Sequence, residues 1–276
     1  MRRRTAARWL VYGGVAVVFA IACAFLSNWQ FTRNADRERQ LALIAANYEA
    51  APVPLAQLIP AGDEFDPADQ WHPVVLRGEY LADEQLLARN RAHGGTSAYE
   101  VLVPFRTDDG RIVVVDRGWV PPGQEQPEPD EIPAPPDGEV TVIARLKPGE
   151  PLPGSGRTAP EGQVPTINLP LVADTVSTPG DVLTSAYGLM VSEDPAPATR
   201  PQAFESPSED PGPHLSYAIQ WILFAVMAFV FLWYMIRTER KHRREDAEDR
   251  ATASAPRRRR DRDMEDEDAL LDRAGG

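Results

Sequence analysis

The sequence predicts a membrane protein in which two transmembrane helices, one N-terminal and one C-terminal, flank a small, mostly β (α+β) extracytoplasmic domain. Two apolar stretches, residues 9–26 and 215–236, contain no Asp, Glu, Lys or Arg. A helix needs about 20 such residues to cross a bilayer. Between them, short runs rich in Val, Leu and aromatics alternate with Gly, Pro and Asp, which is typical of strands and turns.

The basic residues give the topology. They precede the first apolar stretch and follow the second, at Arg2, Arg3, Arg4, Arg8, Arg237, Arg240, Lys241, Arg243 and Arg244. Because positive residues stay cytoplasmic, we expect both termini inside and the central domain outside. The first stretch is longer than a signal-peptide core and lacks a small-x-small cleavage site. No room for a transit peptide precedes Trp9, which favours a multi-pass protein of a bacterial plasma membrane.

The expected segments follow in chain order. They are a cytoplasmic N-terminus at 1–8, transmembrane helix 1 at 9–31, an extracytoplasmic β-rich domain with Pro-rich loops at 32–213, transmembrane helix 2 at 214–236, and a disordered charged cytoplasmic tail at 237–276. The alternation of charge sign in the tail favours disorder.

Composition excludes several classes of protein. The chain has 29 Lys and Arg against 41 Asp and Glu, a formal net charge of −12. Its central segment is acidic, which argues against nucleic acid as a partner. The single cysteine, Cys23, lies in the first apolar stretch. The central domain therefore has no disulfide or thiolate metal site, which excludes copper carriers of the CxxC type and thioredoxin-like proteins.

The elements of the central domain follow from pattern. Residues 33–51 keep helical spacing and extend the first membrane helix until a run of prolines begins at Pro52. Strands are expected at 72–80, 85–91, 99–105, 111–120 and 139–146, with weaker ones at 164–168 and 187–191 and a short helix at 169–176. The sequence DDG at 108–110 predicts a hairpin turn. Pro-rich loops are expected at 121–138, 148–165 and 192–213.

The sequence contains no motif for catalysis. It lacks HExxH, GxSxG, a Walker loop and GxGxxG, so we predict no enzyme, and a membrane-anchored hydrolase is disfavoured. A sensor is disfavoured because the tail carries no recognisable output module. The histidines His72 and His93 are interpreted as structural, and the scattered carboxylates as solvated.

Two clusters at the predicted membrane boundary allow either of two interpretations. On a helix, His214, Tyr217 and Trp221 share one face, which suits an axial ligand of haem iron beside aromatic rings, or an interfacial anchor. A second cluster contains Trp29, Gln30 and Arg33. Its guanidinium suits a haem propionate, or again an interfacial anchor.

The strand at 111–120 ends in a third candidate feature, the sequence Arg117-Gly118-Trp119. Strand alternation predicts that Arg117 and Trp119 lie on the same face. They form either a packing pair or a partner-docking surface, and the spacing leaves both open.

Five segments together resemble the Surfeit locus protein 1 family of cytochrome c oxidase assembly factors. They are LSNWQFTR at 26–33, VVLRGEY at 74–80, YEVLVPF at 99–105, VVVDRGWVPPG at 113–123 and HLSYAIQW at 214–221. Their order and spacing agree with the family to about residue 237. The chain departs from it at Ser27, where the family usually has Gly, and at Asp116, where Asn is common.

The resemblance implies a chaperone of the respiratory chain that helps to insert haem a into a haem-copper oxidase. It implies that His214 binds the haem iron transiently and that five residues shape the pocket: Tyr217, Trp221, Trp29, Gln30 and Arg33. The implied partners are cytochrome c oxidase subunit 1, the haem a synthesis machinery and the lipid bilayer, with docking at Arg117, Gly118 and Trp119. A haem-independent docking scaffold for an oxidase intermediate is the alternative.

Overall fold

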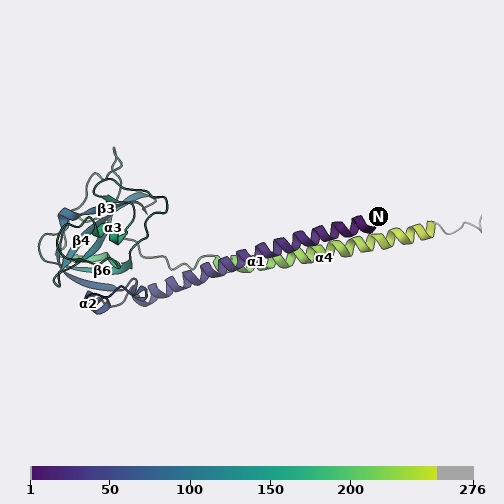
Figure 1. The fold of residues 1–276 in the computed structure, drawn as a ribbon, viewed down its shortest axis with the longest axis horizontal. Coiled ribbons are helices and arrows are strands. Elements are labelled where there is room, and N and C mark those ends of the chain that lie inside the picture. The colour runs from purple at the N-terminus through teal and green to yellow at the C-terminus, as the bar shows by residue number, and fades with distance from the viewer. Residues whose placement is uncertain (1, 254–276) are drawn as a thin grey trace, which may run out of the picture. The chain divides into compact units, whose positions relative to one another are not determined.

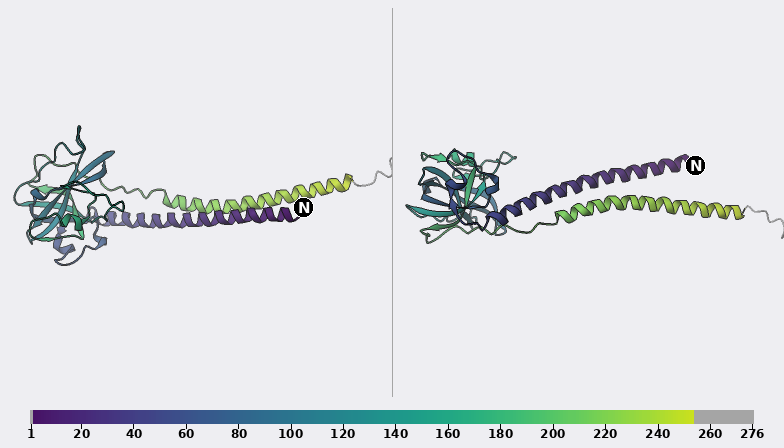
Figure 2. Two further views of the ribbon diagram at one scale, coloured as in Figure 1. Left: turned by 45° about the horizontal axis from the view of Figure 1, so that its top comes forward. Right: turned by 90° about the horizontal axis from the view of Figure 1, so that it is seen from below.

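The computed structural model describes residues 2–253 (Figure 1). It divides into two compact units. The helical unit combines Met1–Ala35 with Gly212–Gly276, and the β domain is Asp36–Pro211. The element order matches the expectation of a terminal helix on each side of a strand-rich segment, and the views of Figure 2 show the same division.

The two terminal helices are longer than their apolar stretches. α1 (Arg2–Asn47) covers the first stretch and continues into the β domain's sequence, as the helical spacing predicts. α4 (His214–Ala253) does not end at residue 236. The predicted disorder therefore does not hold for 237–253, where the pairs Arg243–Glu239 and Lys241–Glu245 lie one turn apart and favour helix. Residues 254–276 of the predicted tail lie outside the described residues.

Both helices are long and apolar enough to cross a membrane. The spans are Ala6–Asn47 and His214–Arg250, whose most apolar windows have a mean hydropathy of 2.3 and 2.2. Large apolar side chains are exposed along both, for example Leu10, Phe25 and Phe231. A soluble monomer rarely exposes so many contiguous apolar side chains, and a bilayer would cover them.

Within the helical unit, one series of less exposed positions on each of α1 and α4 recurs at alternating spacings of four and three residues. On α1 they are Trp9, Gly13, Ala16, Ala20, Cys23, Ser27, Gln30 and Asn34. On α4 they are His214, Ala218, Trp221, Ala225, Ala228, Leu232, Met235 and Glu239. This 3.5-residue period is that of helices packed along a shared seam, and the small residues on α1 allow close approach.

Three polar contacts tie the seam together along its length. Arg8 Nη2 lies 2.8 Å from Glu239 Oε2 near one end, and His214 Nδ1 lies 3.0 Å from Gln30 Oε1 near the other. Between them, the buried Ser27 hydroxyl donates a hydrogen bond to the Ala218 carbonyl over 2.9 Å. Ser27 is thus small enough for close approach of the helices and adds a hydrogen bond between them.

The β domain is built on a closed ring of five strands. They are β2 (Pro73–Tyr80), β4 (Thr96–Thr107), β5 (Arg111–Val120), β6 (Val140–Pro148) and β9 (Ala186–Asp194). β2 pairs with β6, β6 with β9, β9 with β5, β5 with β4, and β4 with β2. All these pairs are antiparallel except β5–β9. Closure leaves the ring without a long open edge.

Shorter elements extend the ring. β3 (Leu86–His93) pairs with β4, and β7 (Gln163–Val164) pairs with β3. β1 (Val53–Pro54) pairs with β2, and β8 (Asp181–Val182) with β5. Two short helices, α2 (Leu55–Leu58) and α3 (Leu169–Ala173), complete the domain with single 3-10 turns at Pro67–Asp69 and Ala82–Glu84.

The core lies on both faces of the strands, which explains their nearly continuous apolar runs. The larger cluster includes Leu76, Val103, Phe105, Val115 and Val142. A second cluster on the other face contains Leu102, Val114 and Ile167 with Leu169 and Val172 of α3. Alternate residues of β4 and β5 therefore enter different clusters, as strand geometry requires.

The five stronger strands of the sequence prediction are all present, as is the hairpin turn at 108–110 between β4 and β5. The weaker predictions hold in part. The strand expected at 164–168 is only the two-residue β7, because Asn168 instead caps α3 through a hydrogen bond from the Leu171 backbone N–H.

Candidate functional site

His214 is the first residue of α4, and its ring meets Gln30 of α1. The two side chains are partly buried, and His214 Nδ1 lies 3.0 Å from Gln30 Oε1. The sequence placed both residues at the membrane boundary, and the structure brings them into contact across 184 positions of the chain. The contact engages Nδ1 and leaves the other ring nitrogen, Nε2, outside it.

The remaining residues of the proposed haem pocket lie on the same two helices. The Arg33 guanidinium lies 5.7 Å from the centre of the Trp29 ring, which is cation–π distance. Trp29 and Tyr217 are each about half exposed, at 48% and 47%. Trp221 lies on the seam, two turns from His214, with its ring 5.7 Å from Phe224. The helical unit therefore carries all six residues, with the Trp29–Arg33 pair on α1 and the two further aromatic rings on α4.

Arg117 has a different position from the one predicted. Its side chain is fully buried, and it forms an ion pair with Glu193, with Nη2 2.7 Å from Oε1. It also donates to the Pro133 carbonyl and lies over the Tyr80 ring. Gly118 is buried as well. Because Arg117 and Gly118 are buried, they do not form a surface on which a partner could dock. Their contacts lie inside the β domain.

Trp119 points away from the contacts of Arg117, so the prediction that the two share a face is wrong. The cause is a bulge, because the pairing of β4 with β5 shifts between Glu100 and Leu102. Trp119 stacks on His93 with the ring centres 5.3 Å apart and an angle of 11° between the planes. Its backbone exchanges two hydrogen bonds with Gln202, of 2.9 and 2.8 Å. This residue is the partly exposed member of the predicted docking motif.

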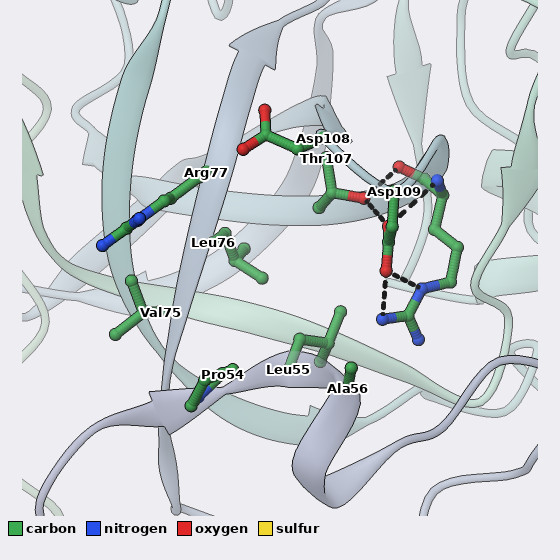
Figure 3. Close-up of a pocket in the computed structure, with 10 residues that line it drawn as sticks. Pro54, Leu55, Ala56, Val75, Leu76, Arg77, Thr107, Asp108 and Asp109 are labelled. Atoms are coloured by element: carbon green, nitrogen blue, oxygen red, sulfur yellow. Dashed lines mark hydrogen bonds and ion pairs between the residues drawn. The ribbon is translucent and has the colours of Figure 1, made fainter.

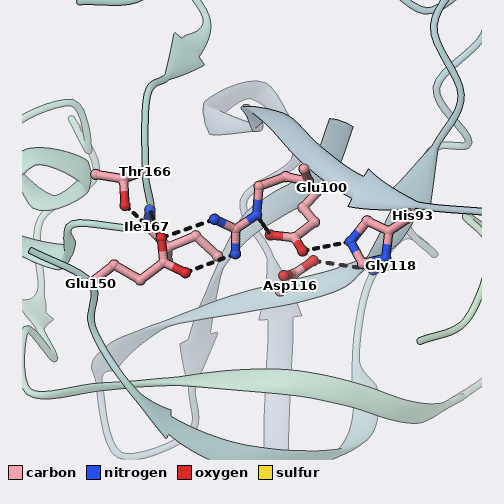
Figure 4. Close-up of polar contacts among 8 residues, drawn as sticks. His93, Glu100, Asp116, Gly118, Glu150, Thr166 and Ile167 are labelled. Carbon is pink, nitrogen blue, oxygen red and sulfur yellow. Dashed lines mark hydrogen bonds and ion pairs between the residues drawn. The ribbon is translucent and has the colours of Figure 1, made fainter. Parts of the chain in front are cut away.

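A chain of charged side chains connects His93 to Glu150 through Glu100 and Arg91 (Figure 4). His93 ends β3 at the two-residue Gly94-Gly95 turn, and its Nε2 lies 2.8 Å from Glu100 Oε1. Arg91 pairs with Glu100 at 2.5 Å and with Glu150 at 2.7 and 3.0 Å. Glu100 and Glu150 are thus held by ion pairs, so the expectation that the carboxylates are solvated is wrong for these two.

Two carboxyl groups near this chain, those of Glu150 and Asp116, have pKa values shifted in opposite directions. Burial opposes ionisation of Glu150, yet hydrogen bonds from Arg91 and Thr166 lower its pKa to about 2. Asp116 is fully buried, and it accepts one hydrogen bond of 3.3 Å from the Gly118 N–H. Burial, followed by repulsion from Glu100, raises the pKa of Asp116 well above its usual value. Among residues 2–253 no group of three or more His, Cys, Asp or Glu is arranged to hold a metal ion.

A cleft of about 360 Å³ lies between α2, β2 and the β4–β5 turn (Figure 3). Its apolar wall contains Leu55 and Val75. On the opposite wall, Arg111 pairs with Asp109 at 2.7 Å and donates to the Ile59 carbonyl at 2.6 Å. The hydrogen bond from Arg111 lowers the pKa of Asp109 to about 2. These charges stabilise the turn, where the Thr107 hydroxyl also donates a hydrogen bond to Asp109.

The family model of the SURF1 family matches residues 17–226, which run from within α1 through the β domain to the first turns of α4. This chain belongs to the SURF1 family. It is 37% identical over 271 residues to an uncharacterized SURF1-like protein of Mycobacterium tuberculosis, covering 97% of this chain and 95% of that protein.

More distant relatives cover part of this SURF1-family chain. It is 25% identical over 143 residues to the cytochrome oxidase assembly protein SHY1 of Saccharomyces cerevisiae, covering 49% of this chain and 35% of SHY1. A SURF1-like protein of Rickettsia felis is 27% identical over 107 residues, covering 38% of this chain and 44% of that protein.

Sequence reasoning missed the partners of two site residues. Glu193 pairs with Arg117 across 76 positions, and Glu100 pairs with His93 across the β3–β4 hairpin. The first has no local signal, since it depends on β5 and β9 lying side by side. The second has only a partial signal. The Gly-Gly turn after His93 predicts the β3–β4 hairpin, but it places His93 opposite Thr96, and a bulge between Ala88 and Arg91 sets the position of Glu100.

Proposed function

We propose that this SURF1-family protein is a membrane-anchored assembly factor for a haem-copper oxidase that binds haem a through His214 and assists its insertion into the catalytic subunit. The family membership, and the similarity to SHY1, which is named a cytochrome oxidase assembly protein, support the oxidase as the target. The two apolar helices support membrane attachment. No catalytic turnover is part of the proposal, because haem is cargo that is captured and released.

The proposed topology has both termini in the cytoplasm and the β domain on the outer face of a bacterial plasma membrane. It is supported by the arginines that flank the two apolar stretches on the sides away from the β domain. In this topology His214 and Gln30 lie at the outer boundary of the bilayer, where the partly exposed rings of Trp29 and Tyr217 suit the interface.

The contact of His214 with Gln30 is the single observation that carries the haem proposal. An axial ligand needs an imidazole with one ring nitrogen fixed by a partner and the other available to the metal. His214 has this arrangement, since its contact with Gln30 engages Nδ1 only. Trp29 and Tyr217 offer apolar surface, and Arg33 offers a positive charge that suits a propionate. The residues present therefore fit a haem held by His214, with Trp221 lining the same helix.

The proposed partners are cytochrome c oxidase subunit 1 and the machinery that synthesises haem a. Trp119 is the residue of the predicted docking motif that can meet a partner. It is held from both sides by His93 and by the Gln202 backbone, so it is an anchor that needs little ordering on binding. This same rigid Trp119 favours the second candidate, a docking scaffold that stabilises an oxidase intermediate without touching haem.

Complementation separates the two candidates. A strain lacking this gene receives wild-type protein, His214→Ala or the matched control His242→Ala, which removes an exposed histidine of the same helix. Haem delivery predicts that His214→Ala inserts in the membrane at wild-type levels, yet lowers the haem a content of the oxidase, whereas His242→Ala restores it. Full restoration by His214→Ala would favour the scaffold.

A further inference from the structure

We propose that Gln30 selects the ring tautomer of His214, so that Nδ1 carries the proton and Nε2 is the atom left to bind iron. That iron binds at Nε2 rests on the proposed function, whereas the choice of tautomer is inferred from the contact alone. The two residues come from different helices, and both are partly buried where they meet. Gln30 is thus a positioning residue that acts on the ligand through its other ring nitrogen.

The hydrogen bond decides the tautomer because a neutral imidazole carries one proton. The Gln30 amide oxygen accepts, so Nδ1 must donate, and the lone pair then lies on Nε2. Metal-binding histidines usually donate their second N–H to an oxygen in this way. A neutral amide gives the imidazole less anionic character than a carboxylate would. The iron–imidazole bond is correspondingly weaker, which suits a protein that must release its haem.

The register between the helices brings the two residues together. Ser27 donates to the Ala218 carbonyl over 2.9 Å in a buried position. Gln30 follows Ser27 by three residues on α1, and His214 precedes Ala218 by four residues on α4. Because both steps are about one helical turn, a hydrogen bond at Ser27 aligns Gln30 with His214 in an antiparallel pair.

Gly212, two residues before the helix, lies near the Nε2 edge of the ring. A Cβ at Gly212 would lie 3.7 Å from His214 Nε2 and 3.6 Å from Cδ2. A side chain at this position would be in van der Waals contact with the edge proposed to face iron, and the φ of +71° at Gly212 favours glycine there. The two ring nitrogens thus have different surroundings, with an amide at Nδ1 and a residue without a side chain near Nε2.

The first test is made on the full-length, haem-free protein in detergent, with ¹⁵N-labelled histidine, at a pH where the ring is neutral. Wild type is expected to show a protonated Nδ1 and an unprotonated Nε2 at His214. Gln30→Leu is expected to lose this preference and Gln30→Glu to keep it, while Gln40→Leu, an exposed glutamine on the same helix, changes nothing. A protonated Nε2 in wild type, or no change in Gln30→Leu, overturns the proposal.

The second test uses the haem-loaded protein, with helix content measured to show that each variant is folded. Gln30→Leu is expected to weaken haem affinity by about 10- to 100-fold, the usual effect of removing a partner of a metal-binding histidine. Gln30→Glu is expected to retain haem and shift its reduction potential to more negative values. Haem binding through His214 with neither effect overturns the role of Gln30. A tautomer that responds to Gln30 in a protein that never binds haem instead contradicts the proposed function alone.

Discussion

Arg117 and Glu193 form a fully buried ion pair inside the β domain. Arg117 Nη2 lies 2.7 Å from Glu193 Oε1 and Nε lies 3.2 Å from Oε2, with the side chains 0% and 2% exposed. The Tyr80 hydroxyl donates to the same carboxylate over 2.9 Å. Burial, followed by the charge of Glu193, raises the pKa of Tyr80 far above its usual value, so the phenol stays protonated. Together the three side chains link β2, β5 and β9.

Breaking this pair is expected to destabilise the fold strongly. Arg117→Ala leaves Glu193 buried without its partner, which typically costs about 3–5 kcal/mol. Denaturant unfolding of the full-length protein in detergent, followed by tryptophan fluorescence, measures the change. The double variant Arg117→Met with Glu193→Leu removes both charges and is expected to recover most of the loss. Equal losses in the single and double variants would show that packing, and not the unpaired charge, is responsible.

Asp116 is expected to make the β domain less stable as pH rises. Its folded-state pKa is raised by burial, and then by Glu100, so the folded domain holds a proton that the unfolded chain releases at about pH 4. Stability from this proton is present at low pH and is lost as pH rises toward the folded-state pKa. Asp116→Asn keeps a neutral hydrogen-bonding group and is expected to remove this fall in stability with rising pH.

Thermal unfolding between pH 4 and pH 8 compares the two proteins. We expect Asp116→Asn to be the more stable at pH 8 and the difference to shrink toward pH 4. A wild-type slope that survives in the asparagine variant would assign the pH dependence to another group.

Glu150 is expected to give the opposite dependence on pH. Its pKa is lowered to about 2 because hydrogen bonds from Arg91 and Thr166 outweigh the effect of burial. The unfolded chain therefore binds a proton first as pH falls, and stability is lost between about pH 5 and pH 2. Glu150→Gln should reduce the loss of stability below about pH 5 without changing the pH dependence of stability near pH 8. Thermal unfolding across this pH range measures both. If the variant lost as much stability at acid pH as wild type, the loss could not be assigned to Glu150.

Gly118 is expected to be intolerant of any side chain. Its φ is +130°, and a Cβ would collide with the Gln202 carbonyl that accepts from the Trp119 N–H. Gly118→Ala is expected to cost more than the roughly 1–3 kcal/mol of backbone strain alone, and to release Trp119 from Gln202. Gly138→Ala is the control, since its φ is +76° but a Cβ meets nothing within 4 Å. Similar losses in both variants would contradict the role of the Gln202 contact.

The sequence predicts the strands and the terminal helices well because those signals are local. Apolar runs in β2, β4, β5 and β6 and the turn at 108–110 carry their own pattern. The bulge that separates Arg117 from Trp119 has no such pattern, because it depends on how β4 pairs with β5. Alternation alone therefore placed the two side chains on one face and gave the wrong prediction.

The candidate haem site likewise has a part that the sequence predicts and a part that it does not. Local spacing identifies His214, Tyr217 and Trp221 on one helix and Trp29 and Arg33 on the other. The contact between His214 and Gln30 depends on helix register across most of the chain, and no local pattern fixes that register. Once the seam positions are known, Ser27 and Ala218 explain it.

The absorption spectrum of the purified full-length protein, co-expressed with haem a synthesis, tests the central claim most directly. The account predicts a haem a spectrum in wild type and in His242→Ala, and its loss in a folded, membrane-inserted His214→Ala. A haem a spectrum that persists unchanged in His214→Ala, or no haem in a folded wild-type protein that still supports oxidase assembly, would contradict it.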